Sequence, residues 1–238
     1  MKWQPTCMIV FALIFIMPNA AWAQSLDIKM GDSQLLRTGL IVSLMAVLPS
    51  VFVCMTAFIR IAIVLSMVRH AFAMPETPPN TVLVSLSIIL TVFVMAPTFA
   101  SVNQLGLQPL LDGRLSVAAA LEAGSEPLRK FMIMHVKDKD LELMYHISKT
   151  TLPASPADVD ILKLTPAFII NELRTAFTIG FVILLPFLLI DLVVSAVLLA
   201  LGMMMVPPAT ISLPIKVLMF VLIDGWSLVI QGVIGGFN

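Results

Sequence analysis

Residues 167–206 read AFIINELRTAFTIGFVILLPFLLIDLVVSAVLLALGMMMV, an apolar run that contains only three charged side chains. A helix that crosses a membrane needs about 20 apolar residues, so this run is too long for one span. No polar loop divides it into two spans. Pro186 and Gly202 are the expected bends, because proline and glycine interrupt regular helices. The run therefore predicts a long, kinked helical element in a membrane.

A proline elbow follows this run. Pro207 and Pro208 predict a sharp turn, and residues 210–233 are apolar enough to form a last span. Together, residues 165–238 are interpreted as the second of two hydrophobic hairpins.

Three consecutive methionines precede this elbow: Met203, Met204 and Met205. They lie between a glycine and two prolines, which disfavour a continuous helix. Because unbranched thioether side chains adapt to changing neighbours, a flexible apolar loop here suits a pore that closes around variable cargo. Ordinary core filling is an equally good interpretation of these residues.

The first hairpin is predicted over residues 24–102. An apolar run over 39–68 leads into a proline-rich elbow, and 81–102 has the length of a plain membrane span. The elbow ends in Pro78, Pro79 and Asn80. The similar Pro-Pro elbows indicate either a weak internal repeat, as transporters have, or a chance likeness between two turns.

The N-terminal residues 1–23 read as a bacterial signal peptide. Lys2 precedes a short apolar stretch, and Ala21-Trp22-Ala23 has the small-x-small form of a cleavage site. The alternative is an uncleaved anchor, although an apolar stretch of about half the spanning length disfavours it. A signal peptide would place the start of the mature chain outside the bacterial inner membrane.

Residues 103–164 form a polar region between the hairpins. Fifteen of the 28 charged residues of the chain lie there, and we interpret the region as a small helical domain on the periplasmic side. Ser116 is a candidate helix cap, and Pro127 is expected near a helix start. Leu128, Phe131, Met132 and His135 recur at the spacing of one helix face.

The composition narrows the function. Apolar residues make up 59% of the chain and charged residues 12%, with a mean hydropathy of +1.03 and a net charge of zero. A soluble domain has about twice as many charged residues, and no basic block indicates a nucleic-acid partner. No nucleotide-binding, metalloprotease or hydrolase motif occurs, so neither an enzyme nor a cofactor is expected. His70, His135 and His146 are scattered and are expected at the solvated surface.

Six charged residues lie within or beside the apolar runs: Arg60, Glu172, Arg174, Asp191, Lys216 and Asp224. Such residues cost free energy in lipid, so they usually pair with one another or line a functional path. Pairing between helices or subunits is favoured over a proton relay. The similar places of Arg60 and Asp191 relative to their elbows indicate that the two hairpins pair there. Lys216 has the alternative of reaching the membrane interface.

With these residues in view, the chain closely resembles the FliP family of flagellar export-gate proteins. The first matching motifs are Phe58-Ile59-Arg60-Ile61, Pro78-Pro79-Asn80, Met95-Ala96-Pro97 and Pro127-Leu128-Arg129-Lys130-Phe131-Met132. The later ones are Leu164-Thr165-Pro166-Ala167-Phe168, Asn171-Glu172-Leu173, Leu185-Pro186-Phe187, Ile190-Asp191-Leu192-Val193, Gly202-Met203-Met204-Met205-Val206-Pro207-Pro208 and Asp224-Gly225-Trp226. The likeness extends from about Leu36 to Asp224.

The resemblance implies a pore and gate subunit of the flagellar type III export apparatus. It implies an all-α membrane protein that forms a pentameric ring with FliQ-like and FliR-like subunits, is joined by an FlhB-like subunit, and passes unfolded flagellar proteins. It also implies that Met203, Met204 and Met205 seal the closed pore. The injectisome SctR relatives share most of these motifs, and a secondary transporter that uses Arg60 and Asp191 is a further alternative.

One stretch departs from the family. Where the family usually has Arg-Asn-Ala-Leu-Gly, this chain has Arg69-His70-Ala71-Phe72-Ala73. The missing glycine removes a position that easily adopts positive φ, so the family's conformation is not carried over to the first elbow.

Overall fold

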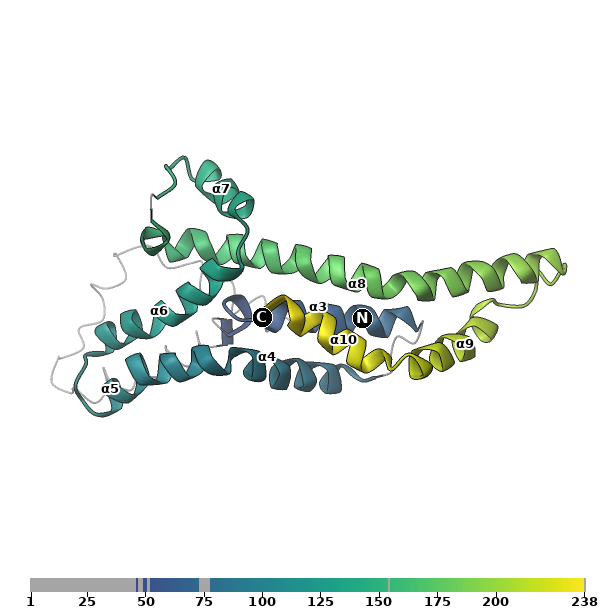
Figure 1. Ribbon diagram of the computed structural model, residues 1–238, viewed down its shortest axis with the longest axis horizontal. Coiled ribbons are helices and arrows are strands. Elements are labelled where there is room, and N and C mark those ends of the chain that lie inside the picture. The colour runs from purple at the N-terminus through teal and green to yellow at the C-terminus, as the bar shows by residue number, and fades with distance from the viewer. Residues whose placement is uncertain (1–45, 47–48, 51, 73–77, 154, 238) are drawn as a thin grey trace, which may run out of the picture. The chain divides into compact units, whose positions relative to one another are not determined.

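The structure is a computed structural model that describes residues 46, 49–50, 52–72, 78–153 and 155–237. The predicted signal peptide and the centre of the first elbow, residues 73–77, lie outside the described residues. Residues 48–238 form one compact unit (Figure 1). Its regular elements are α3 (Phe58–Ala71), α4 (Asn80–Val102), the π-helical turn η2 (Asn103–Leu107), α5 (Gln108–Leu111), α6 (Val117–His135), α7 (Asp138–Ile147), η3 (Pro156–Asp158), α8 (Ile161–Ala200), α9 (Ala209–Leu222), α10 (Gly225–Ile234) and η4 (Gly235–Phe237).

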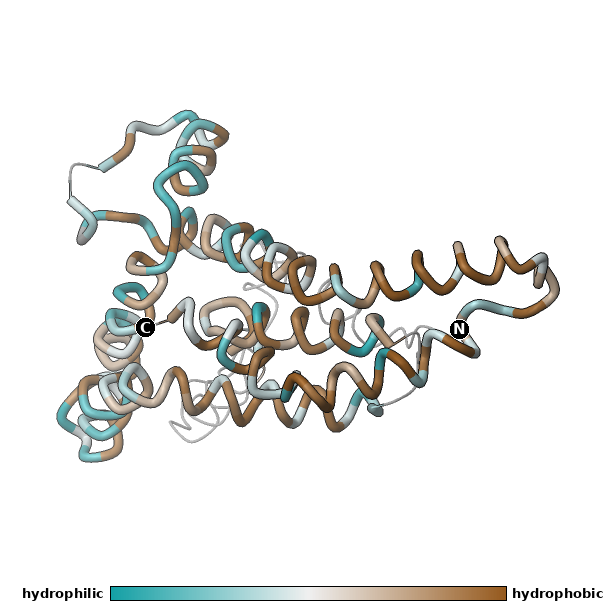
Figure 2. Tube along the Cα trace, turned by 45° about the vertical axis from the view of Figure 1, so that its right-hand side comes forward, coloured by the Kyte–Doolittle hydropathy of each residue, from teal (hydrophilic) through white to brown (hydrophobic). Residues whose placement is uncertain are grey.

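The regular structure in the described part of the chain is all helical, which confirms the predicted all-α membrane protein. Two helices, residues 80–111 and 161–200, are long and apolar enough to cross a membrane, and the bent pair α9–α10 is a third candidate if it counts as one span. Figure 2 shows hydrophobic residues along α4, α8 and α9, whereas hydrophilic residues gather in α6 and α7. Membrane-type helices therefore flank a more polar middle region.

Helix α8 is the longest element of the structure. It begins where the Asp160 side chain accepts a hydrogen bond from the Leu162 N–H at 3.0 Å. It then continues without a break for 40 residues through Pro166 and Pro186. The helix is not interrupted at Pro186, since a long apolar helix tolerates the one hydrogen bond that proline removes. The expected bend at Gly202 is confirmed, because the helix ends there with a φ of 74°.

Helix α3 lies in the centre of the unit, against α4, α8 and α10. Its buried residues Ile61, Val64, Leu65 and Val68 recur at the three- and four-residue spacing of one helix face. On α8, Gly180 lies directly opposite Met67, so a side chain at position 180 would collide with the Met67 sulfur. This lack of a side chain lets α3 and α8 approach closely, and the two hairpins share one core.

The helix of the first hairpin reaches into the predicted middle region. The helix that starts at Asn80 continues past residue 102, through the π-helical turn η2, to Leu111. A Cβ atom on Gly106 would lie 2.9 Å from the Ala120 carbonyl oxygen, so η2 contacts α6 closely. The residue 102 boundary therefore falls inside a helix, because apolar residues and close packing extend helical structure into the polar region.

Helix α6 confirms one prediction in this region and corrects another. The Ser116 hydroxyl accepts a hydrogen bond from the Ala119 N–H at 3.3 Å, as expected of a helix cap. Pro127, however, lies inside α6 rather than near a helix start. Phe131 and Met132, which follow Pro127, are buried in the core, and this tertiary packing outweighs the local preference of proline.

The predicted last span is also divided. It consists of α9 and α10, which are bent by 68° at Ile223 and Asp224. Asp224 has a left-handed backbone with a φ of 51°. Gly225 lies against the Phe220 ring, where an added Cβ would be 2.1 Å from a ring carbon. Hydropathy alone did not reveal this break, since both halves are apolar.

Candidate functional site

The second elbow is a turn closed by backbone hydrogen bonds at the end of α8. The Met203 N–H donates to the Leu198 carbonyl at 2.9 Å, and the Gly202 N–H donates to the Leu199 carbonyl at 3.0 Å. This pair of bonds, with glycine at positive φ, is the Schellman motif that ends many helices. Pro208 then precedes α9. Gly202 therefore sets the direction in which the chain leaves α8.

The three methionines of this turn project from the chain. Met203 is 43% exposed, Met204 80% and Met205 95%. Adjacent apolar side chains that contact so little of their own chain do not fill its core, so core filling within a single chain is the wrong interpretation. Their position, at the tip where α8 turns into α9 (Figure 1), leaves them free to contact other molecules.

In the described part of the first elbow, a side-chain hydrogen bond joins the two helices. The Arg69 Nη1 donates to the Asn80 Oδ1 at 2.5 Å and so links the end of α3 to the start of α4. Pro79 precedes α4, and its carbonyl accepts from the Val82 and Leu83 N–H groups. The expectation about the missing family glycine concerns position 73, which lies outside the described residues.

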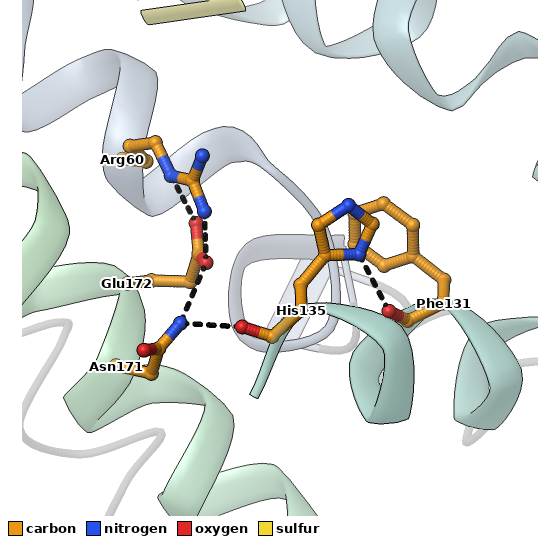
Figure 3. A network of polar contacts seen from close by, with 5 residues as sticks. All are labelled: Arg60, Phe131, His135, Asn171 and Glu172. Atoms are coloured by element: carbon orange, nitrogen blue, oxygen red, sulfur yellow. Dashed lines mark hydrogen bonds and ion pairs between the residues drawn. The ribbon is translucent and has the colours of Figure 1, made fainter. Parts of the chain in front are cut away.

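Arg60 and Glu172 form a buried ion pair between the hairpins (Figure 3). The Arg60 Nε donates to Oε2 at 2.8 Å and its Nη2 donates to Oε1 at 2.5 Å, while the two side chains are 3% and 0% exposed. This two-bond geometry is the strongest form of such a pair. The guanidinium carbon also lies 3.6 Å from the centre of the Phe237 ring, a cation–π contact. Arg60 thus joins α3, α8 and the C-terminal turn η4.

Asn171 extends this pair toward the middle region. Its Nδ2 donates to the His135 backbone carbonyl at 2.7 Å and lies 3.4 Å from the Glu172 Oε1 (Figure 3). The His135 ring lies against the Phe131 and Phe237 rings. His135 is half-buried rather than fully solvated, because Phe131 of its own helix and Phe237, which is distant in sequence, cover part of its ring. The spacing of His135 with Phe131 on one helix face was the available signal.

Lys216 and Asp191 form a second pair, between α9 and α8. The Lys216 Nζ donates to the Asp191 Oδ2 at 2.6 Å and to the Ala71 carbonyl, at the end of α3, at 3.1 Å. Lys216 is buried, so it does not reach the membrane interface. Arg60 and Asp191 do not contact one another, since each of these residues has a different partner.

Arg174 and Asp224 have different environments. Arg174 pairs with Asp140 of α7 at 2.8 Å and so holds the polar region against α8. Asp140 was not singled out from the sequence, because it is one of many charged residues in that region and only its burial distinguishes it. Asp224 is exposed, and its carboxylate has no hydrogen-bond or ion-pair partner among the residues that the structure describes.

Comparison with known proteins agrees with these motifs. The family model described as FliP family matches residues 41–233. The chain belongs to the FliP family. The flagellar biosynthetic protein FliP of Bacillus subtilis is 46% identical over 198 residues, which cover 83% of this chain and 90% of that protein. The proteins of the same name from Caulobacter vibrioides and Pectobacterium carotovorum are 46% and 42% identical and cover 94% and 96% of this chain, and 86% and 92% of their own lengths.

Membership in the FliP family confirms the resemblance stated from the sequence. The chain is a membrane-embedded component of the flagellar protein export apparatus, with a transport role rather than a known catalytic one. Its geometry contains a protruding methionine turn and a buried ion pair, Arg60–Glu172, that joins the two hairpins.

Proposed function

We propose that this FliP-family chain is a pore subunit of the flagellar export gate, and that Met203, Met204 and Met205 seal the closed channel. In this arrangement copies of the chain form a pentameric ring with FliQ-like and FliR-like subunits, and an FlhB-like subunit joins them. Unfolded flagellar proteins pass through the ring from the cytoplasm. The elbows at Pro78, Pro79 and Asn80 and at Pro207 and Pro208 set the ends of the two hairpins.

The exposure of the methionine turn carries this proposal. Apolar side chains that are between 43% and 95% exposed at a hairpin tip are unfavourable in water. Five such tips that meet around an axis would bury one another and exclude water and ions. Methionine suits this role because its flexible, polarizable side chain packs against irregular neighbours and adapts when a polypeptide enters.

The rest of the second hairpin supports assembly with other subunits. Much of α8 beyond the core remains apolar and exposed, including Leu188, Leu189 and Leu192. The charged pairs lie within the chain, with Arg174 and Asp191 partly exposed, and Arg60 and Asp191 have different partners. A transporter that depends on these two residues together has no support in this geometry.

The test is the leakage of ions through membranes that contain the export gate. Changing Met203, Met204 and Met205 together to alanine removes three large side chains from the seal, and we expect a clear rise in conductance across the inner membrane. The measurement is the uptake of small ions or solutes by cells that express the complete gate. Unchanged leakage, with the ring still assembled, would contradict the role of the turn.

Met134 offers a matched control. It is also exposed, at 67%, but lies on α6 in the middle region. Met134→Ala removes an exposed methionine away from the elbow and is expected to leave the membrane as tight as before.

A further inference from the structure

The segment that carries the three methionines is held by hydrogen bonds on both sides. Before it, the Gly202 and Met203 N–H groups donate to carbonyls in the last turn of α8. After it, the Thr210 N–H and hydroxyl both donate to the Pro207 carbonyl, at 3.1 and 2.7 Å. Proline also restricts its own backbone. The connection between α8 and α9 therefore has a defined path.

The tip of this segment is itself a turn. The Val206 N–H donates to the Met203 carbonyl at 3.3 Å, so Met204 and Met205 occupy the two central positions of a four-residue turn. They are also the most exposed of the three methionines, at 80% and 95%. Because the backbone has a defined shape here, the adaptability that a seal needs lies in the thioether side chains.

Gly202 is the residue on which this shape depends. Its φ of 74° lies in the left-handed region, which glycine adopts freely and residues with a Cβ atom adopt at a cost. Asparagine tolerates this region better than most residues, and β-branched residues tolerate it least. A Cβ atom added to Gly202 would meet no described atom within 4 Å. A substitution there therefore strains the backbone without a collision inside the described part of the chain.

We propose that Gly202 is a positioning residue of the methionine seal. Its left-handed backbone holds the turn in the orientation in which Met204 and Met205 close the channel. Strain at residue 202 turns the tip away and opens the seal while all three methionines are still present. This role rests on the proposed seal and adds the residue that directs it.

Gly113 offers a control with the same local structure. Its φ is 71°, the Arg114 N–H donates to the Pro109 carbonyl at 2.9 Å, and the Gly113 N–H donates to the Leu110 carbonyl at 3.1 Å. A Cβ atom added to Gly113 also meets no described atom within 4 Å. Gly113 lies between α5 and α6. The same substitution therefore strains the same kind of helix end at both glycines, but only Gly202 is next to the methionines.

The first measurement is the uptake of small ions by cells that express the complete gate. Valine lowers the population of the left-handed conformation by about 5- to 30-fold, so we expect Gly202→Val to raise leakage toward that of the triple methionine-to-alanine variant. Gly202→Ala is expected to give a smaller rise. Gly202→Asn should keep the membrane nearly tight, because asparagine tolerates positive φ. Gly113→Val should leave leakage unchanged.

The second measurement is amide hydrogen exchange of the full chain in detergent, which does not require the ring. The amides of residues 202 and 203 are protected by their bonds to α8. Relative to the unstructured chain of the same sequence, we expect Gly202→Val to speed their exchange about fivefold or more. Gly202→Ala should speed it less, and Gly202→Asn should hardly change it. Unchanged exchange in Gly202→Val would overturn the proposal even if this variant does not assemble.

The order of the substitutions separates backbone strain from crowding. If Gly202→Asn leaks more than Gly202→Ala, leakage follows side-chain size, and a collision with another subunit rather than positioning explains it. Unchanged leakage in Gly202→Val with an assembled ring would likewise overturn the positioning role. Equal leakage in Gly113→Val would assign the effect to a general loss of stability and would also overturn it.

The outcomes distinguish this role from the seal itself. Leakage after the methionine changes but not after Gly202→Val would refute the positioning role and leave the seal standing. A tight membrane after the methionine changes would refute the seal, and the positioning role with it, whatever the exchange of the amides at residues 202 and 203.

Discussion

Arg60 connects three separate elements through one guanidinium group. It binds Glu172 of α8 with two hydrogen bonds and lies over the Phe237 ring of η4. Gly236 is part of this arrangement, because a Cβ at that position would lie 2.7 Å from the Arg60 Nη1. Removing one member of a buried ion pair lowers stability by more than the intact pair contributes, because the other charge is left buried and unpaired.

Glu172→Gln tests this pair at the scale of one residue. The substitution keeps the shape of the side chain but removes its charge, so Arg60 stays buried without a counter-charge. We expect the free energy of unfolding to fall by about 3–5 kcal/mol, measured by thermal unfolding of the purified protein in detergent.

Asp112→Asn is the control for this substitution. Asp112 pairs with Arg114 at 2.6 Å, but both side chains are largely exposed. Surface pairs contribute little to stability, so the transition temperature should hardly change. Equal losses of stability from the two substitutions would contradict a larger contribution of the buried pair.

At the scale of elements, the second hairpin combines one unbroken helix with one broken helix. Helix α8 passes through two prolines, whereas the apolar segment after the elbow bends by 68° between α9 and α10. The bend depends on packing, because the Phe220 ring lies against Gly225 and contacts the Phe72 and Trp226 rings edge-on. The absence of a side chain at Gly225 thus lets an aromatic cluster form at the break.

Gly225→Ala should disturb this cluster. The new Cβ would overlap the Phe220 ring, which is buried and cannot simply turn away. Overpacking of this kind costs about 1–3 kcal/mol, and the effect can be measured as a lower transition temperature. Gly235→Ala is the matched control, since an added Cβ there has no neighbouring atom within 4 Å. A similar loss of stability in both variants would argue against the packing role of Gly225.

At the scale of the whole molecule, the described unit leaves many apolar side chains exposed for a protein of its size. They lie along α4, α8 and α9 and include Ile89, Phe93, Leu192 and Val221. A membrane or other subunits must cover surfaces of this kind. The polar helices α6 and α7 are instead held to α8 through Asn171 and Arg174, so the middle region has a defined place on the hairpins.

The predicted periplasmic location of the middle region can be tested by labelling. Glu142 is an exposed residue of α7. In a chain that carries Cys7→Ser and Cys54→Ser, we expect Glu142→Cys to react with a membrane-impermeant thiol reagent in cells whose outer membrane has been opened. Reaction only after the inner membrane is disrupted would place the middle region in the cytoplasm and reverse the predicted topology.

The sequence by itself determined the class of the protein and the ends of two of its helices. The apolar runs predict membrane helices, Ser116 predicts a helix start, and Gly202 predicts a helix end, because each of these signals is local. The motif from Gly202 to Pro208 likewise indicated the FliP family before any geometry was known. Local chemistry is enough for such features, since neighbouring residues and the solvent decide them.

Only the tertiary structure decided which charges meet. The sequence placed six charged residues in or beside apolar runs, yet Arg60 pairs with Glu172 rather than Asp191, and Arg174 pairs with Asp140 from another region. Helix α8 stays whole at Pro186 while the last apolar segment breaks at Asp224. Partners of this kind are distant along the chain and depend on how the helices pack, so spacing in the sequence does not specify them.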